Sequence, residues 1–332
     1  MKFCLFPLLF LVQWLGATEA TLGPERDAAV RLQIYLDENL FGPGFIDGKP
    51  GTFTQRAVAS YNRAKGREED DQLVQMEADE HVDSTYVTAI VPPSAKRFVN
   101  GSLSYKREEQ ARAKALSYRS YFEYMAERYH TSESVLYELN GKKKTWGVSP
   151  GRSLIVPNVE PFRIEEIQAG RMHTGEDSDL AQRKVIIDIA ERQVQFYEAP
   201  QQLLVSNNEG AAEEEVPWRL IASFPTTPGQ DRYIHRGTWR LKNTIEWPVW
   251  RYDKQMLEKG KRSDEALNIP GGPNNPVGVL WAGLSKSGIG IHGTDSPRTI
   301  GRARSSGCYR LANWDAIRIP QLVRPGATVI VR

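Results

Sequence analysis

Hydrophobic residues at helical spacing predict two short helices within residues 25–66. A glycine-rich turn from Phe41 to Gly51 separates them. In this turn Pro50 follows a Gly-Lys pair where a phosphate-binding loop has Ser or Thr, so that kind of site is excluded. The apolar positions that define the two helix faces are Val30, Leu32, Ile34, Tyr35, Leu40, Ala57, Val58 and Tyr61.

Residues 67–115 have no sustained hydrophobic period and are rich in charge, acidic first and basic later. We interpret them as a charged linker with some helix, and we expect a strand at Tyr86–Val91 that two prolines end. Residues 118–162 return to helical spacing and then enter a short apolar strand that ends at Pro157. This second segment is predicted to be a compact helix–helix–strand unit.

The hydrophobic period changes from Lys184 onward, where apolar and polar residues alternate in several short runs. Turns separate these runs at regular intervals, and helical patterns are sparse. We therefore expect residues 184–332 to form a β-sandwich or an open barrel. The fold class predicted for the whole chain is a multidomain α+β protein, with a mainly-β C-terminal domain preceded by small helical modules.

Residues 1–20 follow a different pattern. Lys2 precedes an apolar stretch that ends at Leu15, and alanines stand at positions 17 and 20. This arrangement predicts a secretory signal peptide, and the stretch is too short to span a membrane. No later apolar run reaches about 18 residues, so we expect no transmembrane segment in the mature chain. The alternative is an uncleaved membrane anchor.

The charge balance narrows the range of partners. The chain has 43 Lys and Arg against 41 Asp and Glu, a formal net charge of +2. Nucleic-acid binding requires a concentrated basic excess, so we expect no nucleic-acid partner. No His-Glu-x-x-His or paired-cysteine spacing is present, and we expect neither a metal nor an organic cofactor.

Cleavage after residue 20 would leave Cys308 as the single cysteine of the chain. His292 lies sixteen residues earlier, and the loop between them is rich in Gly, Ser and Pro. Such a loop can place an imidazole beside a thiol, and that pairing predicts a thiolate near neutral pH. Gly307 permits a sharp turn that aims backbone N–H groups at an oxyanion.

Positive charge is concentrated in the same loop. It favours a thiolate and attracts substrates that carry free carboxylates. Arg310, two residues after the cysteine, is the candidate to bind such a group. The arginines of this segment are Arg298, Arg302, Arg304 and Arg310. The remaining histidines, which are scattered singly and expected to be structural or exposed, are His81, His130, His173 and His235. Of these, His235 is the alternative partner for the cysteine, since it lies in the same domain.

These motifs resemble the YkuD-type L,D-transpeptidase domain over residues 184–332. The matching residues are His292-Gly-Thr, Ser305-x-Gly-Cys308-x-Arg310-Leu, Asn275-Pro-Val-Gly, Ile300-Gly and Asn313-Trp-Asp-Ala316. Residues 25–66 resemble the small helical peptidoglycan-binding domains. Residues 118–162 resemble in part a LysM-like glycan-binding module, whose opening strand is not evident in this segment.

The resemblance implies a cysteine acyltransferase of bacterial peptidoglycan, exported to the periplasm or cell wall. Cys308 would attack the carbonyl of the third stem-peptide residue, release D-alanine and pass the acyl group to an amine. His292 would be the general base, oriented by the carbonyl of Gly293, and the backbone at Gly307 and Cys308 would stabilise the oxyanion.

The resemblance also implies substrate contacts from Arg310, Thr294, Ser305 and Ser306. Ser306 stands where the family usually has His, so local hydrogen bonding and the choice of acceptor are expected to differ. The implied partners are peptidoglycan stem peptides, glycan strands and, as an acceptor, a wall-anchored protein.

Three alternatives stay open at the level of sequence. The first is an L,D-carboxypeptidase, in which water replaces the acceptor amine. The second is a non-catalytic wall-binding protein that uses the upstream modules. The third is an intermolecular disulfide through Cys308.

Overall fold

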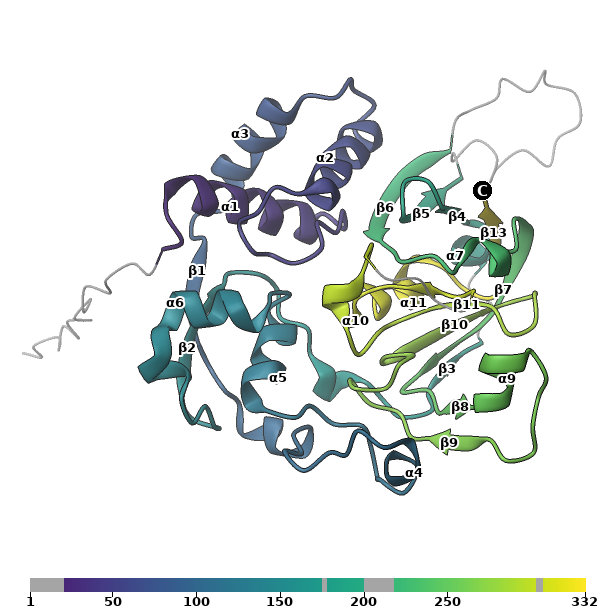
Figure 1. Cartoon of the computed structure of the whole chain (residues 1–332). Helices are drawn as coiled ribbons and strands as arrows, with labels where there is room; N and C mark the ends of the chain where they lie inside the picture. The colour runs from purple at the N-terminus through teal and green to yellow at the C-terminus, as the bar shows by residue number, and fades with distance from the viewer. Residues whose placement is uncertain (1–20, 175–177, 200–217, 303–306) are drawn as a thin grey trace, which may run out of the picture.

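The computed structural model describes residues 21–174, 178–199, 218–302 and 307–332. The predicted signal peptide at 1–20 lies outside the described residues. A helical unit, a mixed unit and a β-rich C-terminal domain follow one another along the chain (Figure 1). The mainly-β fold expected for the C-terminal domain, behind a small helical N-terminal part, is confirmed.

The N-terminal unit contains three helices: α1 (Pro24–Glu38), α2 (Thr52–Ala64) and α3 (Asp71–His81). The first two are the helices expected on either side of the glycine-rich turn. The third helix lies in the segment interpreted as a linker, and it buries Val74 and Ala78 in the same core as α1 and α2. The acidic stretch is therefore a solvated helix face on a packed unit, because its sparse apolar residues recur at helical spacing.

The mixed unit is built on an antiparallel pair, β1 (Tyr86–Ile90) with β2 (Ser153–Pro157). Between these strands lie α5 (Tyr121–Arg128) and α6 (Glu133–Thr145), together with two short elements, η1 (Pro93–Arg97) and α4 (Arg107–Gln110). The first strand of this unit, β1, lies in the segment interpreted as a linker, and an insertion separates it from α5. The unit has strand–helix–helix–strand order, and its LysM-like character stays a prediction.

The C-terminal domain is organised around a nine-stranded sheet whose order is β12-β11-β10-β7-β13-β4-β5-β6, with β3 also pairing with β7. The strands are β3 (Met172–His173), β4 (Lys184–Asp188), β5 (Gln193–Glu198), β6 (Arg219–Pro225), β7 (Gly237–Glu246), β10 (Leu280–Leu284), β11 (Gly290–His292), β12 (Tyr309–Arg310) and β13 (Thr328–Val331). A separate pair joins β8 (Trp250–Tyr252) and β9 (Leu267–Ile269).

The ten-residue strand β7 joins the two halves of this sheet. Its first residues pair with β13 and its last residues pair with β10, so the sheet curls around a core between its two halves. Alternate residues of β4 and β13, such as Val185 and Val329, point into that core. Short helices cover the remaining surface: η2 (Ile164–Glu166), α7 (Ser178–Gln182), η3 (Asp231–Tyr233), α9 (Lys254–Lys259), η4 (Pro297–Thr299), α10 (Asn313–Ala316) and α11 (Ile319–Leu322).

A buried charged cluster holds the three units together. The guanidinium of Arg318 donates to both oxygens of Asp37 in α1, at 3.2 and 2.7 Å. His130, which follows α5, lies with Nδ1 3.1 Å from the same carboxylate and stacks on Trp314 of α10 at 5.3 Å between ring centroids. Asp37 is fully buried, and Arg318 and His130 hold its pKa far below the ordinary range.

Candidate active site

The parallel pairing of β11 and β12 brings the predicted catalytic residues onto one face of the sheet. His292 pairs with Arg310, and Ile291 pairs with Tyr309. Cys308 directly precedes β12 and lies two residues before Arg310. Because side chains alternate along an extended chain, Cys308, Arg310 and His292 share one face, with the thiol diagonal to the imidazole.

The His292 ring is fixed by its surroundings. Its Nδ1 lies 2.6 Å from the carbonyl oxygen of Gly293, the contact expected from the sequence. One face of the ring stacks on Trp281 of β10, with the ring centroids 5.6 Å apart and the ring planes 19° from parallel. A ring that donates from Nδ1 keeps Nε2 as a proton acceptor. Burial lowers the pKa of His292 to about 4, and the positive charge of Arg310 adds to this effect.

The Cys308 thiol lies against the backbone of the preceding strand. Its Sγ is 3.5 Å from the carbonyl oxygen of Gly288, and the N–H of Gly290 lies close enough to favour a thiolate. Burial outweighs that hydrogen bond and raises the pKa of the thiol to about 11. Burial therefore favours a neutral thiol beside a neutral imidazole in this state of the protein, whereas the sequence predicts a thiolate near neutral pH.

Two of the loop arginines line a surface cleft that does not include Cys308. Arg298 and Arg302 line a cleft on the side of the loop that faces the helical unit, and neither His292 nor Cys308 lines it. Arg304 lies outside the described residues, as do two predicted substrate contacts, Ser305 and Ser306. Thr294 is buried, and its hydroxyl accepts from the backbone N–H of Ser296, so it serves the turn after β11.

The turn before the cysteine depends on two glycines. Gly307 has φ 115°, a conformation that favours glycine. A Cβ added to it would lie 3.0 Å from the carbonyl oxygen of Tyr233, and a Cβ on Gly229 would lie 2.5 Å from the Gly307 Cα. The loop that follows β6 thus packs directly on the backbone beside Cys308.

Arg310 carries unused hydrogen-bonding capacity. Among the described residues, its Nε and Nη2 atoms are buried without a hydrogen-bond partner. Buried guanidinium nitrogens are rarely left unpaired, so these donors are poised to bind an acceptor. Its backbone is held by Thr227, through bonds of 3.0 and 3.1 Å in both directions.

The other histidines occupy structural or exposed positions. His130 belongs to the buried cluster described above, and His173 lies 2.7 Å from a carboxylate oxygen of Glu246. His81 contacts the backbone of its own helix, and His235 is exposed. In the described ranges, no group of three or more His, Cys, Asp or Glu could hold a metal ion.

Sequence reasoning missed a buried support behind His292. Asn313 accepts from the N–H of Val279 at 3.1 Å and donates to Glu127 of α5 at 2.9 Å. A Cβ on Gly293 would lie 2.2 Å from the Asn313 side-chain oxygen, so the two groups are in close contact. Asn313 was noted only as part of a motif, and Glu127 is 186 residues away from it, so no local signal linked them.

The segment that contains His292 and Cys308 is similar to known proteins. Residues 182–331 match the model of the L,D-transpeptidase catalytic domain, YkuD. The chain is 42% identical over 65 residues to the putative L,D-transpeptidase YkuD of Bacillus subtilis, covering 20% of this chain and 40% of that protein. It is 34% identical over 109 residues to a putative L,D-transpeptidase of Fuscovulum blasticum, covering 32% of this chain and 56% of that protein.

Among solved structures, L,D-transpeptidase 3 from Mycobacterium tuberculosis is 14% identical, with a TM-score of 0.31 over 55% of this chain and 74% of the other. The chain spans about half or less of the length of the curated relatives that it matches. Residues 182–331 of the chain are therefore similar to the L,D-transpeptidase catalytic domain. No described helix is long and apolar enough to cross a membrane.

Proposed function

We propose that this protein is a peptidoglycan L,D-transpeptidase with Cys308 as its nucleophile. The observation that carries the proposal is the shared face of β11 and β12, where the only cysteine of the domain lies diagonal to a buried, oriented histidine. Its position inside the segment that matches the L,D-transpeptidase catalytic domain supports the same reaction.

The first half-reaction begins from a neutral pair. Nε2 of His292 takes the thiol proton as Sγ attacks the carbonyl carbon of the third stem-peptide residue. Backbone N–H groups at Gly307 and Cys308 stabilise the oxyanion that forms. The C–N bond to D-alanine then breaks, and the imidazolium gives its proton to the departing amine. A thioester on Cys308 and free D-alanine are the products.

The second half-reaction resolves the thioester. An amine of a second stem peptide loses a proton to His292 and attacks the same carbonyl carbon. A new C–N bond forms, the C–S bond breaks, and the proton returns to the sulfur. Arg310 binds a substrate carboxylate through its unpaired nitrogens, which also places the stem peptide beside the cysteine.

The upstream units extend the proposal from the domain to the whole protein. The N-terminal pattern of residues 1–20 favours export, which brings the protein to its peptidoglycan substrate. The helical unit over residues 25–66 and the LysM-like unit over residues 118–162 are proposed to hold wall strands near the catalytic domain. The acceptor is a stem-peptide amine or the amine of a wall-anchored protein.

Mass spectrometry of the protein with purified disaccharide-tetrapeptide tests this function, with Cys308→Ala as the control. We expect dimers lighter than two tetrapeptides by one D-alanine, and none with the variant. Disaccharide-tripeptide as the sole product would replace the transpeptidase with an L,D-carboxypeptidase. Unchanged substrate without an adduct on Cys308 would refute both enzymes and favour a wall-binding protein.

A further inference from the structure

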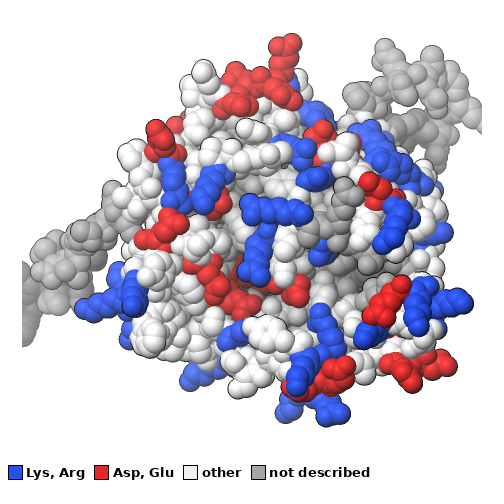
Figure 2. Space-filling view, viewed as in Figure 1, with Lys and Arg blue, Asp and Glu red and all other residues white. Residues whose placement is uncertain are grey.

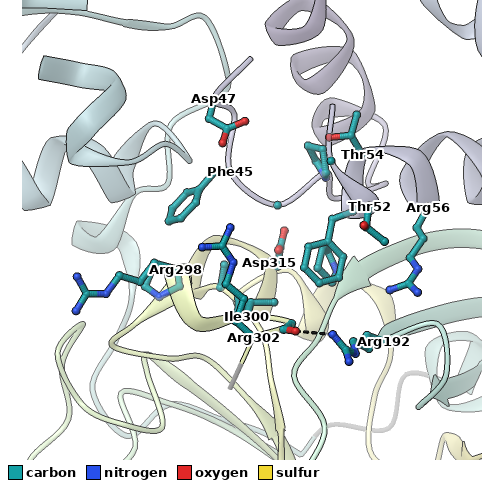
Figure 3. A pocket seen from close by; sticks show the side chains of 18 of the residues that line it. Phe45, Asp47, Thr52, Thr54, Arg56, Arg192, Arg298, Ile300, Arg302 and Asp315 are labelled. Carbon is teal, nitrogen blue, oxygen red and sulfur yellow. Dashed lines mark hydrogen bonds between the residues drawn. The ribbon is translucent and has the colours of Figure 1, made fainter. Parts of the chain in front are cut away.

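A cleft separates the helical unit from the catalytic domain beside the cysteine loop. It encloses about 530 Å³, within the range of ligand sites in proteins. Figure 2 shows Lys and Arg side chains gathered around a hollow on this face of the molecule. In Figure 3, Phe45, Asp47, Thr52 and Arg56 come from the wall of the helical unit, and Arg302 comes from the catalytic domain.

The wall of the helical unit ends in the first turn of α2. Thr52, Phe53 and Thr54 of this turn line the cleft, and its N-cap residue, Gly51, supplies no side-chain hydrogen bond. The first N–H groups of a helix have no partner within the helix, and they carry partial positive charge. A helix of thirteen residues therefore presents its positive end to the cleft.

The opposite wall adds full positive charges. Arg302 is exposed, and in the described part of the chain it has neither an ion pair nor a side-chain hydrogen bond. Arg298 lies within electrostatic reach of Glu133. Arg192 donates to the carbonyl oxygen of Gly301, and Arg56 pairs with Glu191 at 3.1 Å.

Negative charge in the cleft is already engaged or suppressed. The lining contains five cationic side chains and two carboxyl groups, Asp47 and Asp315. Asp47 accepts from the backbone N–H of Lys49 at 2.9 Å and from Gln33 at 3.2 Å. Burial raises the pKa of Asp315 to about 8, and its Oδ1 lies 3.6 Å from the guanidinium of Arg318, so this carboxyl group adds little free negative charge to the cleft. The surplus charge of the cleft is positive.

The cleft shares a wall with the catalytic face. The N–H of Gly301, in the cleft wall, donates to the hydroxyl of Thr227 at 2.7 Å. The backbone of Thr227 in turn pairs with Arg310, two residues after the nucleophile. A peptide held in the cleft therefore lies beside the loop that carries Cys308, although it does not occupy the position of the peptide under attack.

We propose that this cleft binds the carboxylate-bearing stem peptide of the acceptor strand, through Arg302 and the N-terminus of α2. The inference rests on the proposed function, which requires a second stem peptide in addition to the one that acylates Cys308. Phe45, Phe53 and Trp314 supply an apolar lining for the peptide chain. The positive groups recognise its free carboxylates.

Disaccharide-tripeptide is the probe for this site, because it has the acceptor amine but no terminal D-alanine to release. Its affinity for the Cys308→Ala protein is measured by calorimetry, alone and with Arg302→Gln added. We expect the Kd to rise about five-fold with this substitution and by more with Arg302→Glu. Arg262→Gln, an exposed arginine outside the cleft, is the matched control and should bind as the parent does.

A second probe isolates the carboxylates. The same tripeptide with its carboxyl groups amidated should bind the Cys308→Ala protein as weakly as the unmodified tripeptide binds the Cys308→Ala, Arg302→Gln protein. Added salt should reduce the difference in affinity between the amidated and the unmodified tripeptide. Equal affinity for both probes, or an Arg302→Gln affinity equal to that of the parent, would overturn the cleft site. Urea unfolding of each variant verifies that the fold is intact.

The same proteins separate this inference from the proposed function. Acylation of Cys308 by disaccharide-tetrapeptide depends only on the first half-reaction. It is followed as a mass increase on the protein that retains Cys308. Carboxylate-dependent binding without acylation would refute the transpeptidase and keep the cleft site. Normal acylation with binding that does not respond to Arg302 would refute the cleft site alone.

Discussion

We predict that Cys308 ionises only in strongly alkaline solution when no substrate is bound. Burial raises the pKa of its thiol from 9.0 to about 11, against the weaker opposing effect of the Gly290 N–H. Each pKa unit changes the thiolate population about tenfold, so the thiolate fraction at neutral pH is about 100-fold below that of an ordinary cysteine. The buried imidazole of His292 stays neutral down to about pH 4 and supplies no positive charge.

The assay is the rate of Cys308 alkylation by iodoacetamide as a function of pH. The chain from Thr21 to Arg332 contains no other cysteine, so the signal has one source. The informative quantity is the midpoint of the rate profile, because the intrinsic reactivity of a thiolate itself rises with its pKa. The same protein unfolded in urea supplies the reference midpoint near 9.0.

A midpoint well above that of the unfolded protein is expected. The pKa shift also makes the folded protein less stable as the pH rises from 9.0 toward 11, because only the unfolded thiol loses its proton there. A midpoint below neutrality would refute the reasoning, since it would require a thiolate–imidazolium pair that burial disfavours. The pH dependence of kcat/KM provides a second measurement. Its acidic midpoint should lie at about pH 4, the pKa of His292, instead of in the usual histidine range.

Three further predictions concern contacts away from the thiol. Arg318→Met should lower the free energy of unfolding in urea by about 3–5 kcal/mol, because it leaves the buried Asp37 carboxylate without its guanidinium partner and with His130 as its remaining side-chain contact. An added Asp37→Asn should restore part of the loss. Burial raises the pKa of Glu127 to about 8, so the folded protein favours the protonated carboxyl group and loses stability as the pH rises from 4.5 to about 8. Glu127→Gln should make the free energy of unfolding less dependent on pH over this range, and an unchanged dependence would contradict the prediction. Gly229→Ala should reduce kcat at least tenfold, because its methyl would lie 2.5 Å from the backbone before the nucleophile, whereas Gly101→Ala, whose nearest contact is 3.6 Å, should have little effect; equal activity of the two variants would contradict it.

The sequence predicts those features that local pattern encodes. Alternating hydrophobic residues predict the β-rich C-terminal domain, and the helices around the glycine-rich turn follow from their apolar spacing. The sequence predicts a pairing of His292 and Cys308 because one loop connects them. The position of Arg298 and Arg302 in a cleft that does not include Cys308 could not be predicted from their place in the same loop.

Long-range contacts could not be predicted from the pattern. β1 was placed in a linker because its partner, β2, lies beyond an insertion and two helices. The stacking of Trp281 on His292 depends on the register between β10 and β11, which the sequence of either strand leaves open. The raised pKa of the thiol follows from burial, and burial is a property of the packed structure.

The upstream units form part of the catalytic structure as well as preceding it in sequence. Trp314 and Val279, both from the C-terminal domain, share a hydrophobic core with Tyr124 and Leu136 of α5 and α6. Removal of the mixed unit would expose that core, and it would also leave Asn313 without its Glu127 acceptor. Since Asn313 packs against Gly293, whose carbonyl orients His292, the orientation of the His292 ring depends on a helix that lies outside residues 182–331.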